Sequence, residues 1–145
     1  MHGADSPDAG LTLNLPARLP SVMHALETIS QFARLRNIGG ATLARLNVAV
    51  EELATNTIKY GYGGECDRPI RIALAAPRDA DMVELTYEDE AAPFDPLDWH
   101  ARWQARPIAG GREPGGRGIA LVVGLSRGAA YSPLAPGNRL RLRIG

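Results

Sequence analysis

Alternating apolar and polar side chains predict a series of short β-strands in this chain. Residues 11–15 read Leu-Thr-Leu-Asn-Leu, the period-two pattern of a strand with one buried face. The other expected strands are residues 70–75, 82–88, 129–132 and 139–144. Pro-Arg-Asp-Ala at 77–80 and Pro-Gly-Asn at 136–138 are turn sequences. We therefore expect the second and third strands, and the last two, to form antiparallel hairpins.

Apolar side chains at helical spacing predict two longer helices between the first two strands. Val22, Leu26 and Ile29 recur every three or four residues within a helix expected over about residues 20–36. A second helix is expected from about residue 41 to residue 60, because the Gly-Tyr-Gly-Gly sequence that follows is a glycine-rich stop.

The order of the elements predicts a single α+β domain. Shorter helices are expected at residues 98–104 and 117–125, before the last hairpin. The expected architecture is a two-layer sandwich, in which helices cover one face of an antiparallel or mixed, mostly antiparallel, sheet. Residues 1–10 are polar and are expected to be a disordered tail, and residues 11–145 to form one domain. The prolines and glycines of residues 91–116 predict a lid.

Composition excludes several classes of function. The 145 residues include 16 basic and 16 acidic side chains, so no overall field favours nucleic acid or an anionic membrane. The single cysteine, Cys66, rules out an internal disulfide and a cysteine-rich zinc site. The longest apolar run, residues 119–123, is too short to cross a bilayer, and the first ten residues do not resemble a signal peptide. We therefore expect a cytoplasmic protein.

A row of polar residues on the second long helix is the strongest functional candidate. At 100° per residue, Glu52, Asn56 and Lys59 fall within an arc of about 60°, whereas Glu51 points away from them. A carboxylate beside a neutral amide oxygen suits a hard cation and a polarisable hydroxyl group. The alternative is an ordinary solvated helix face, which is the commoner meaning of such a row.

Two further segments carry residues suited to a nucleotide. Asp89 ends a predicted strand, where it could accept a hydrogen bond from an amino group such as that of adenine, or simply form a turn. Gly115, Gly116 and Gly118 lead into a helix, whose backbone N–H groups could bind phosphate, or they form a flexible connector. The sequence contains neither a P-loop nor a dinucleotide-binding glycine motif.

In this order, the three segments resemble the GHKL ATPase superfamily and, within it, the anti-sigma-factor serine kinases of bacterial partner-switching systems. The N box of that family is similar to Glu52-x-x-x-Asn56 followed by Tyr-Gly-Tyr at 60–62. Its first glycine box resembles Asp-Glu-Ala-Ala-Pro-Phe-Asp-Pro at 89–96, and its second resembles Gly-Gly-Arg-Gly-Ile-Ala-Leu-Val at 115–122. The resemblance covers about residues 11–144.

The resemblance implies ATP and Mg²⁺ as cofactors and a role for each candidate residue. Asn56 would hold Mg²⁺ against the ATP phosphates, and Asp89 would bind the adenine amine. Glu52 would accept the proton of an attacking serine hydroxyl, while Gly116 and Gly118 would line the triphosphate under the lid. The other nucleotide-binding residues expected from the boxes are Lys59, Ala91, Gly115 and Arg117.

The resemblance also implies partners. The phosphorylated serine would lie on a small antagonist protein of the STAS type, and the second partner would be a sigma factor. The family further implies a homodimer, with no direct contact to nucleic acid or membrane.

Ala91 stands where the first glycine box usually has glycine. If that turn requires a positive φ, alanine costs on the order of 1 kcal/mol and weakens nucleotide binding. This departure supports an alternative function, a binding module of the same fold that sequesters a partner without transferring phosphate. A regulatory ATPase domain from a larger phosphatase or sensor protein is a third possibility.

Overall fold

The computed structural model of the protein describes residues 10–77, 81–105 and 116–145. The described chain contains α-helices, β-strands and one short π-helical turn, η2. In chain order, the elements are β1 (Leu11–Pro16), α1 (Leu19–Leu35), α2 (Gly40–Asn56), η2 (Thr57–Gly61), β2 (Pro69–Ala75), β3 (Val83–Asp89), α3 (Pro96–Ala105), α4 (Gly116–Leu125), β4 (Ser126–Leu134) and β5 (Gly137–Ile144).

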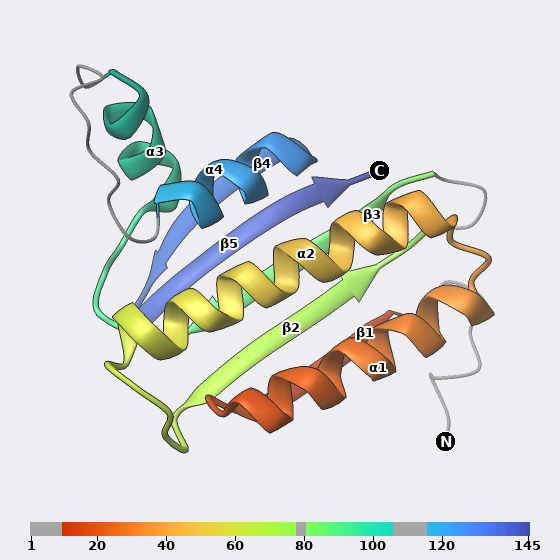
Figure 1. Ribbon diagram of the computed structural model, residues 1–145, viewed down its shortest axis with the longest axis horizontal. Helices are drawn as coiled ribbons and strands as arrows, with labels where there is room; N and C mark the ends of the chain where they lie inside the picture. The colour runs from red at the N-terminus through yellow and green to blue at the C-terminus, as the bar shows by residue number, and fades with distance from the viewer. Residues whose placement is uncertain (1–9, 78–80, 106–115) are drawn as a thin grey trace.

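The strands form one sheet in the order β1-β2-β3-β5-β4. Each neighbouring pair is antiparallel, which confirms the α+β class and selects the antiparallel form of the two that the sequence allowed. The expected hairpins are present as β2–β3 and β4–β5. Helices α1, α2 and α4 lie over the same face of the sheet, with α3 beside α4 near one end (Figure 1).

The hydrophobic core lies between the sheet and these helices. Alternate strand residues such as Ile72, Leu85 and Leu142 point toward the helices and are almost fully buried. From the helical side, Ile29 and Val50 are completely buried, as the 3.6-residue period predicts. Fully burying one such side chain contributes about 1.5–3 kcal/mol, so this layer positions the helix ends that carry the polar residues.

The second long helix differs from its expected form in its last turn. Helix α2 ends at Asn56, and residues 57–61 continue as one turn of π-helix. The N–H of Tyr62 donates to the carbonyl of Thr57, five residues earlier, at 2.7 Å. The expectation of a helix with regular α geometry to residue 60 is therefore wrong over its last four residues, 57–60, because a π turn holds more residues than an α turn.

Two expected boundaries also change. Strand β4 begins at Ser126 and ends at Leu134, longer at both ends than residues 129–132. Helix α3, expected at residues 98–104, spans Pro96–Ala105. The carboxylate of Asp95 caps it by accepting from the N–H groups of Leu97 and Asp98 at 2.9 and 3.1 Å. Residues 106–115 of the expected lid, and the expected tail, lie outside the described residues, Gly10 excepted.

Candidate functional site

A cavity of about 360 Å³ opens at the end of α2, beside the turn after β3. This volume falls in the range of small-molecule sites. Much of the wall is apolar and includes Leu53, Ile119 and Leu140. Tyr60 and Phe94 line the cavity and are also 59% and 45% exposed, so they stand at its opening.

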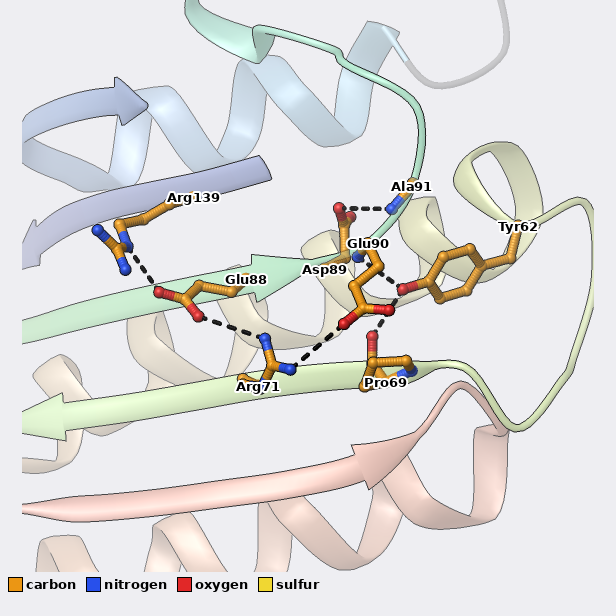
Figure 2. A network of polar contacts seen from close by, with 8 residues as sticks. All are labelled: Tyr62, Pro69, Arg71, Glu88, Asp89, Glu90, Ala91 and Arg139. Carbon is orange, nitrogen blue, oxygen red and sulfur yellow. Dashed lines mark hydrogen bonds and ion pairs between the residues drawn. The ribbon is translucent and has the colours of Figure 1, made fainter. Parts of the chain in front are cut away.

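Asp89 is the buried charged group of this cavity. Its Oδ2 accepts a hydrogen bond from the Thr57 hydroxyl at 2.9 Å. Its Oδ1 accepts from the Ala91 N–H at 3.2 Å and from Asn138 Nδ2 at 2.9 Å, and Figure 2 shows the Ala91 contact. Each carboxylate oxygen can accept about two hydrogen bonds, so Oδ2 keeps the capacity for one more donor. A ligand amino group can use that capacity.

The Thr57 hydroxyl is itself held by Tyr87. The two hydroxyl oxygens are 2.6 Å apart. Because Thr57 has one proton and gives it to Asp89, the Tyr87 hydroxyl is the donor in this pair. The Leu53 carbonyl, 3.2 Å from the Tyr87 oxygen, competes for the same single proton. Burial raises the pKa of the Tyr87 hydroxyl well above its usual value, so the donor remains protonated.

Asn138, at the start of β5, holds the same carboxylate from the other side. Its Nδ2 also lies 3.1 Å from the Ala92 carbonyl, and its Oδ1 accepts from the Phe94 N–H at 2.9 Å and from the Tyr131 hydroxyl. One carboxamide thus joins Asp89, the turn after β3 and strand β4. Sequence analysis noted this position only as part of the closing hairpin. A carboxamide directly after a turn glycine was the available signal.

Tyr62 fixes the residue that follows Asp89. Its hydroxyl accepts from the Glu90 N–H at 2.8 Å and donates to the Pro69 carbonyl at 2.7 Å (Figure 2). The Arg68 guanidinium lies over the Tyr62 ring, 4.4 Å from its centre. The loop after η2 is therefore tied to the end of β3 where the carboxylate stands.

Ala91 occupies its turn without the strain that the sequence suggested. Among the described residues, Asn37 is the one non-glycine with a positive φ, so the condition for a penalty at Ala91 is not met. Its side chain is buried against Gly61, where an added Cβ would lie 3.0 Å from the Ala91 methyl. The larger residue in the turn is matched by a glycine in η2.

Glu52 and Asn56 face the first turn of α4. A Cβ on Gly118 would lie 2.6 Å from Glu52 Oε2 and 3.6 Å from Asn56 Nδ2. Only a glycine lets the two elements approach this closely without a shift. The structure therefore brings the N-box carboxylate and amide to the start of a helix, where backbone N–H groups are unpaired.

Of the candidate residues from the sequence, some line the cavity and others do not. Asn56, Asp89 and Ala91 line the cavity. Lys59 is exposed and is not among the residues that line the cavity; it lies in the π turn, beyond the regular α-helix on which the expected arc was based. Gly116 begins α4, whereas Gly115 and the side chain of Arg117 lie outside the described residues.

Two other features, a metal site formed by protein side chains and a membrane-spanning helix, can be assessed in the described residues. They contain no group of three or more His, Cys, Asp or Glu side chains placed to hold a metal ion. None of the helices in the described ranges is long and apolar enough to cross a membrane.

The fold and this site define an ATPase domain of a known type. Residues 15–144 match the family described as Histidine kinase-like ATPase domain. Since the match covers most of the chain, the protein belongs to this family. An ATPase domain implies ATP as a ligand, in agreement with the expectation from the sequence.

Two solved structures share the fold. The chain is similar to the RsbU and RsbW domains of Rv1364c from Mycobacterium tuberculosis, with a TM-score of 0.65 and 17% identity, over 94% of this chain and 32% of that one. It is also similar to a chain of the SiaB–SiaC complex from Pseudomonas aeruginosa, with a TM-score of 0.65 and 15% identity, over 92% of this chain and 88% of that one. The chain thus spans about a third of the first structure. No curated protein matches the sequence.

Proposed function

We propose that the protein is an ATP-dependent protein-serine kinase and anti-sigma factor, which phosphorylates a STAS-type antagonist and sequesters a sigma factor. The observation that carries the proposal is the pairing of two features at one end of α2. One is the buried Asp89 carboxylate with acceptor capacity left in an apolar cavity. The other is the Glu52 and Asn56 side chains, set against the start of α4.

The chemistry of the cavity supports adenine as the base. The largely apolar wall favours an aromatic ring, and Oδ2 of Asp89 favours a donor such as the exocyclic amine. A base with a carbonyl oxygen at that position would place an acceptor against a carboxylate, which is repulsive. The hydroxyl of Thr57 cannot relieve this repulsion, because its one proton is already used on Asp89.

The residues present fit a magnesium ion that is held mainly by nucleotide phosphates. Mg²⁺ usually keeps several waters and binds one or two protein oxygens together with substrate phosphates. The amide oxygen of Asn56 can serve as such a ligand, and the described residues offer no all-protein cage that would compete with it. Bound there, the ion supplies charge neutralisation for the phosphates.

In the transfer step, the serine oxygen of the antagonist attacks the γ-phosphorus of ATP. The bond from that phosphorus to the bridging β–γ oxygen breaks, ADP leaves, and Glu52 accepts the serine proton. Such reactions depend mostly on positioning and electrostatics, and a placed base typically adds about 10²–10⁴-fold. Glu52 is suited to this role because its carboxylate is half-buried and next to Gly118, whereas Glu51 is exposed.

The similar structures support the expected kind of partner. One match includes an RsbW domain beside an RsbU domain, and the other is a SiaB–SiaC complex. The second is a complex of two proteins, which supports a protein partner for this chain, and the proposal assigns that role to a STAS-type antagonist and adds a sigma factor. A cytoplasmic location follows from such partners.

The test compares three variants on one helix. Glu52→Gln should preserve ATP affinity and slow phosphoryl transfer to the antagonist at least about 10²-fold. Asn56→Ala should remove the magnesium dependence of nucleotide binding, measured by calorimetric titration with and without Mg²⁺. Glu51→Gln is the matched control, because it makes the same chemical change one residue away and should leave both properties unchanged.

Identical behaviour of Glu52→Gln and Asn56→Ala would contradict this division of roles. ATP binding without any phosphorylation of a STAS-type antagonist would instead favour the binding module. The structural support for that alternative was strain at Ala91, and the negative φ there removes it.

A further inference from the structure

Strand β4 forms one edge of the sheet, and no strand of the described chain pairs with its outer side (Figure 1). Two features that disfavour strand pairing lie near its ends, a register shift between Ser126 and Gly128 and the proline Pro133. Residues 128–132 between them read Gly-Ala-Ala-Tyr-Ser and carry no charged side chain. The middle of this edge therefore lacks the charges that protect many edge strands from pairing.

Pro133 indicates which backbone groups of β4 point outward. Proline has no N–H group, so within a sheet it is tolerated where that group would face away from the neighbouring strand. The direction alternates from residue to residue in an antiparallel strand. The backbone groups of Ala129 and Tyr131 therefore share the outward direction of Pro133, whereas those of Gly128 and Ala130 point toward β5. The edge offers the N–H and C=O groups of Ala129 and Tyr131 to an added strand.

Two arginines of β5 lie beside this edge, on the face of the sheet opposite the helices, which we call the open face. Arg141 and Arg143 are exposed, and neither forms an ion pair with another residue in the described ranges. Arg139, two residues earlier on the same strand, differs from them because it bonds Glu88 at 2.6 Å (Figure 2). Two positive charges of the open face are thus left for a ligand.

The Arg143 side chain lies over the edge strand. A Cβ added to Gly128 of β4 would lie 3.7 Å from Arg143 Cδ and 4.0 Å from both Nε and Nη1. Glu84 of β3 is the cross-strand neighbour of Arg143 on the other side, and these two described residues form no ion pair. Arg141 has an uncharged residue directly across from it on β3 and on β4. The guanidinium of Arg143 is therefore placed one strand nearer the free edge.

We propose that the free edge of β4 binds an extended acidic segment of a partner protein as an additional strand. The outward backbone groups of Ala129 and Tyr131 pair with the backbone of the segment, as in other cases of β-strand addition. Two carboxylates of the segment, at alternate positions on the open face, bond Arg141 and Arg143. The backbone contacts supply affinity, and the two arginines select an acidic sequence.

The spacing of the sheet allows these contacts. An added strand lies about 4.8 Å beyond β4 and about 9.6 Å from β5. Gly128 and Ala130, which lie between on β4, are too small to block a long arginine side chain from crossing that gap. Side chains at alternate positions of a strand are about 6.6 Å apart, so two carboxylates of the segment match the two arginines of β5.

The opposite edge of the sheet lacks this charge pattern. Next to β1, strand β2 carries Arg71 on the open face, and its guanidinium lies 3.7 Å from Glu88 and 3.3 Å from Glu90. A carboxylate added beside β1 would therefore approach a basic group that two acids already neutralise. The β4 edge also offers backbone donors and acceptors together, which suits a peptide better than a phosphate group with acceptor oxygens alone.

This docking site goes beyond the proposed kinase function and does not depend on it. Arg141 and Arg143 lie on the open face, whereas the cavity lies on the helix side of the sheet. Peptide binding can therefore be measured without nucleotide, and its failure would leave the kinase proposal standing.

The experiment measures binding of a fluorescein-labelled peptide to the full chain by fluorescence anisotropy. The probe has nine residues, the length of β4, and alternates threonine, which favours strands, with glutamate, which supplies the carboxylates. Replacing its glutamates by glutamine should weaken binding about 10-fold, the effect of two exposed ion pairs. N-methylation of its amides should abolish binding, because the methyl groups block backbone pairing.

Gly128→Glu is the most specific variant of the protein for this test. Its Cβ would meet only ordinary van der Waals contacts, the nearest at 3.7 Å from Arg143 Cδ, and its carboxylate would pair with the Arg143 guanidinium. The variant should remain folded, with a melting temperature at or above that of wild type. It should bind the probe about 10-fold more weakly, because one arginine is neutralised and the new charge repels glutamate.

Two further variants separate the backbone contacts from the charges. Ala129→Pro removes an outward N–H group and should abolish binding of the probe. Arg143→Gln should weaken binding about threefold, the effect of one exposed ion pair. Arg45→Gln, the same change on the exposed surface of α2, is the matched control and should bind the probe as wild type does.

Each outcome decides the proposal. Weaker binding by the glutamine peptide and by Gly128→Glu, with loss of binding in Ala129→Pro, is the expected result. A wild-type chain that does not bind the probe, or that binds the glutamine or N-methylated peptide equally well, would overturn the proposal. Self-association in sedimentation that Ala129→Pro abolishes would assign the edge to a second copy of the chain and overturn the acidic segment as its occupant. Circular dichroism of each variant establishes that the sheet has remained folded.

Discussion

Replacing Asn138 by aspartate converts the donor that holds Asp89 into a second carboxylate of nearly the same shape. The distance between Asn138 Nδ2 and Asp89 Oδ1 is 2.9 Å, so two oxygens would meet there. At an effective dielectric constant of about 20, two unit charges at that separation repel by about 6 kcal/mol. Because the Asn138 side chain is only half-buried, solvent reduces this to about 3 kcal/mol.

The repulsion makes the variant sensitive to pH. Two carboxyl groups in such contact share one proton, and about 3–6 kcal/mol raises the pKa of the introduced carboxyl by roughly two to four units. Below about pH 6, the shared proton restores a hydrogen bond across the pair. Above about pH 8, the pair is doubly charged and the turn that carries Asp89 is pushed apart. The variant should therefore lose stability and affinity as the pH rises.

Two assays check the prediction. Calorimetric titration at about pH 8 should show ATP affinity lowered by about 10²-fold, and affinity at about pH 5 should be close to wild type. Thermal unfolding without nucleotide should show a melting temperature lowered by roughly 6–12 °C at the higher pH alone. Asn138→Ala removes the donor without adding charge, so its defect should not vary with pH. A pH-independent defect in Asn138→Asp, or none, would refute the reasoning.

Three other substitutions test individual contacts. Gly118→Ala places a Cβ 2.6 Å from Glu52 Oε2, so it should displace the carboxylate and slow phosphoryl transfer more than it weakens ATP binding, as separate rate and titration measurements would show. Gly61→Ala should lower the melting temperature because its Cβ would lie 3.0 Å from the Ala91 methyl, and adding Ala91→Gly should restore it. The raised pKa of Tyr87 stabilises the fold below about pH 10, and this contribution is lost as the pH rises through the folded-state value. Tyr87→Phe should therefore be less stable than wild type at neutral pH, and the gap should close during alkaline unfolding.

The sequence was sufficient for the parts of the fold that depend on local periodicity. Alternation over residues 11–15 and 70–75 predicted β1 and β2, since a half-buried strand repeats every two residues. The candidate Lys59 shows where this logic stops. Its place in the polar row assumed 100° per residue beyond Asn56, and the backbone changes to a π turn one residue later. No residue pattern in the helix marks that change.

The polar contacts around Asp89 could not be predicted from spacing. Its partners Thr57 and Asn138 lie 32 and 49 residues away in the chain, and the Thr57–Tyr87 contact spans 30 residues. Thr57 lies one turn after Leu53, and both side chains are buried on the side of the helix that faces the core. Helical spacing alone does not reveal that the Thr57 hydroxyl contacts a carboxylate, because this contact depends on how the helix packs on the sheet. Motif resemblance supplied Asp89 and its neighbour Ala91, but it did not indicate that Thr57 and Asn138 hold the carboxylate.

Strand β3 presents two different sets of polar residues on its two faces. Tyr87 and Asp89 point toward the helices and the cavity, whereas Glu84 and Glu88 point to the open face. Because successive side chains of a strand point to opposite faces, a charge reversal at Glu84 does not touch the carboxylate in the cavity. A shift of the β3 register by one residue would exchange the two sets and bury glutamates in the core. The buried contacts of Tyr87 and Asp89 therefore fix the register that also sets Glu84 and Glu88 across from the arginines of β5.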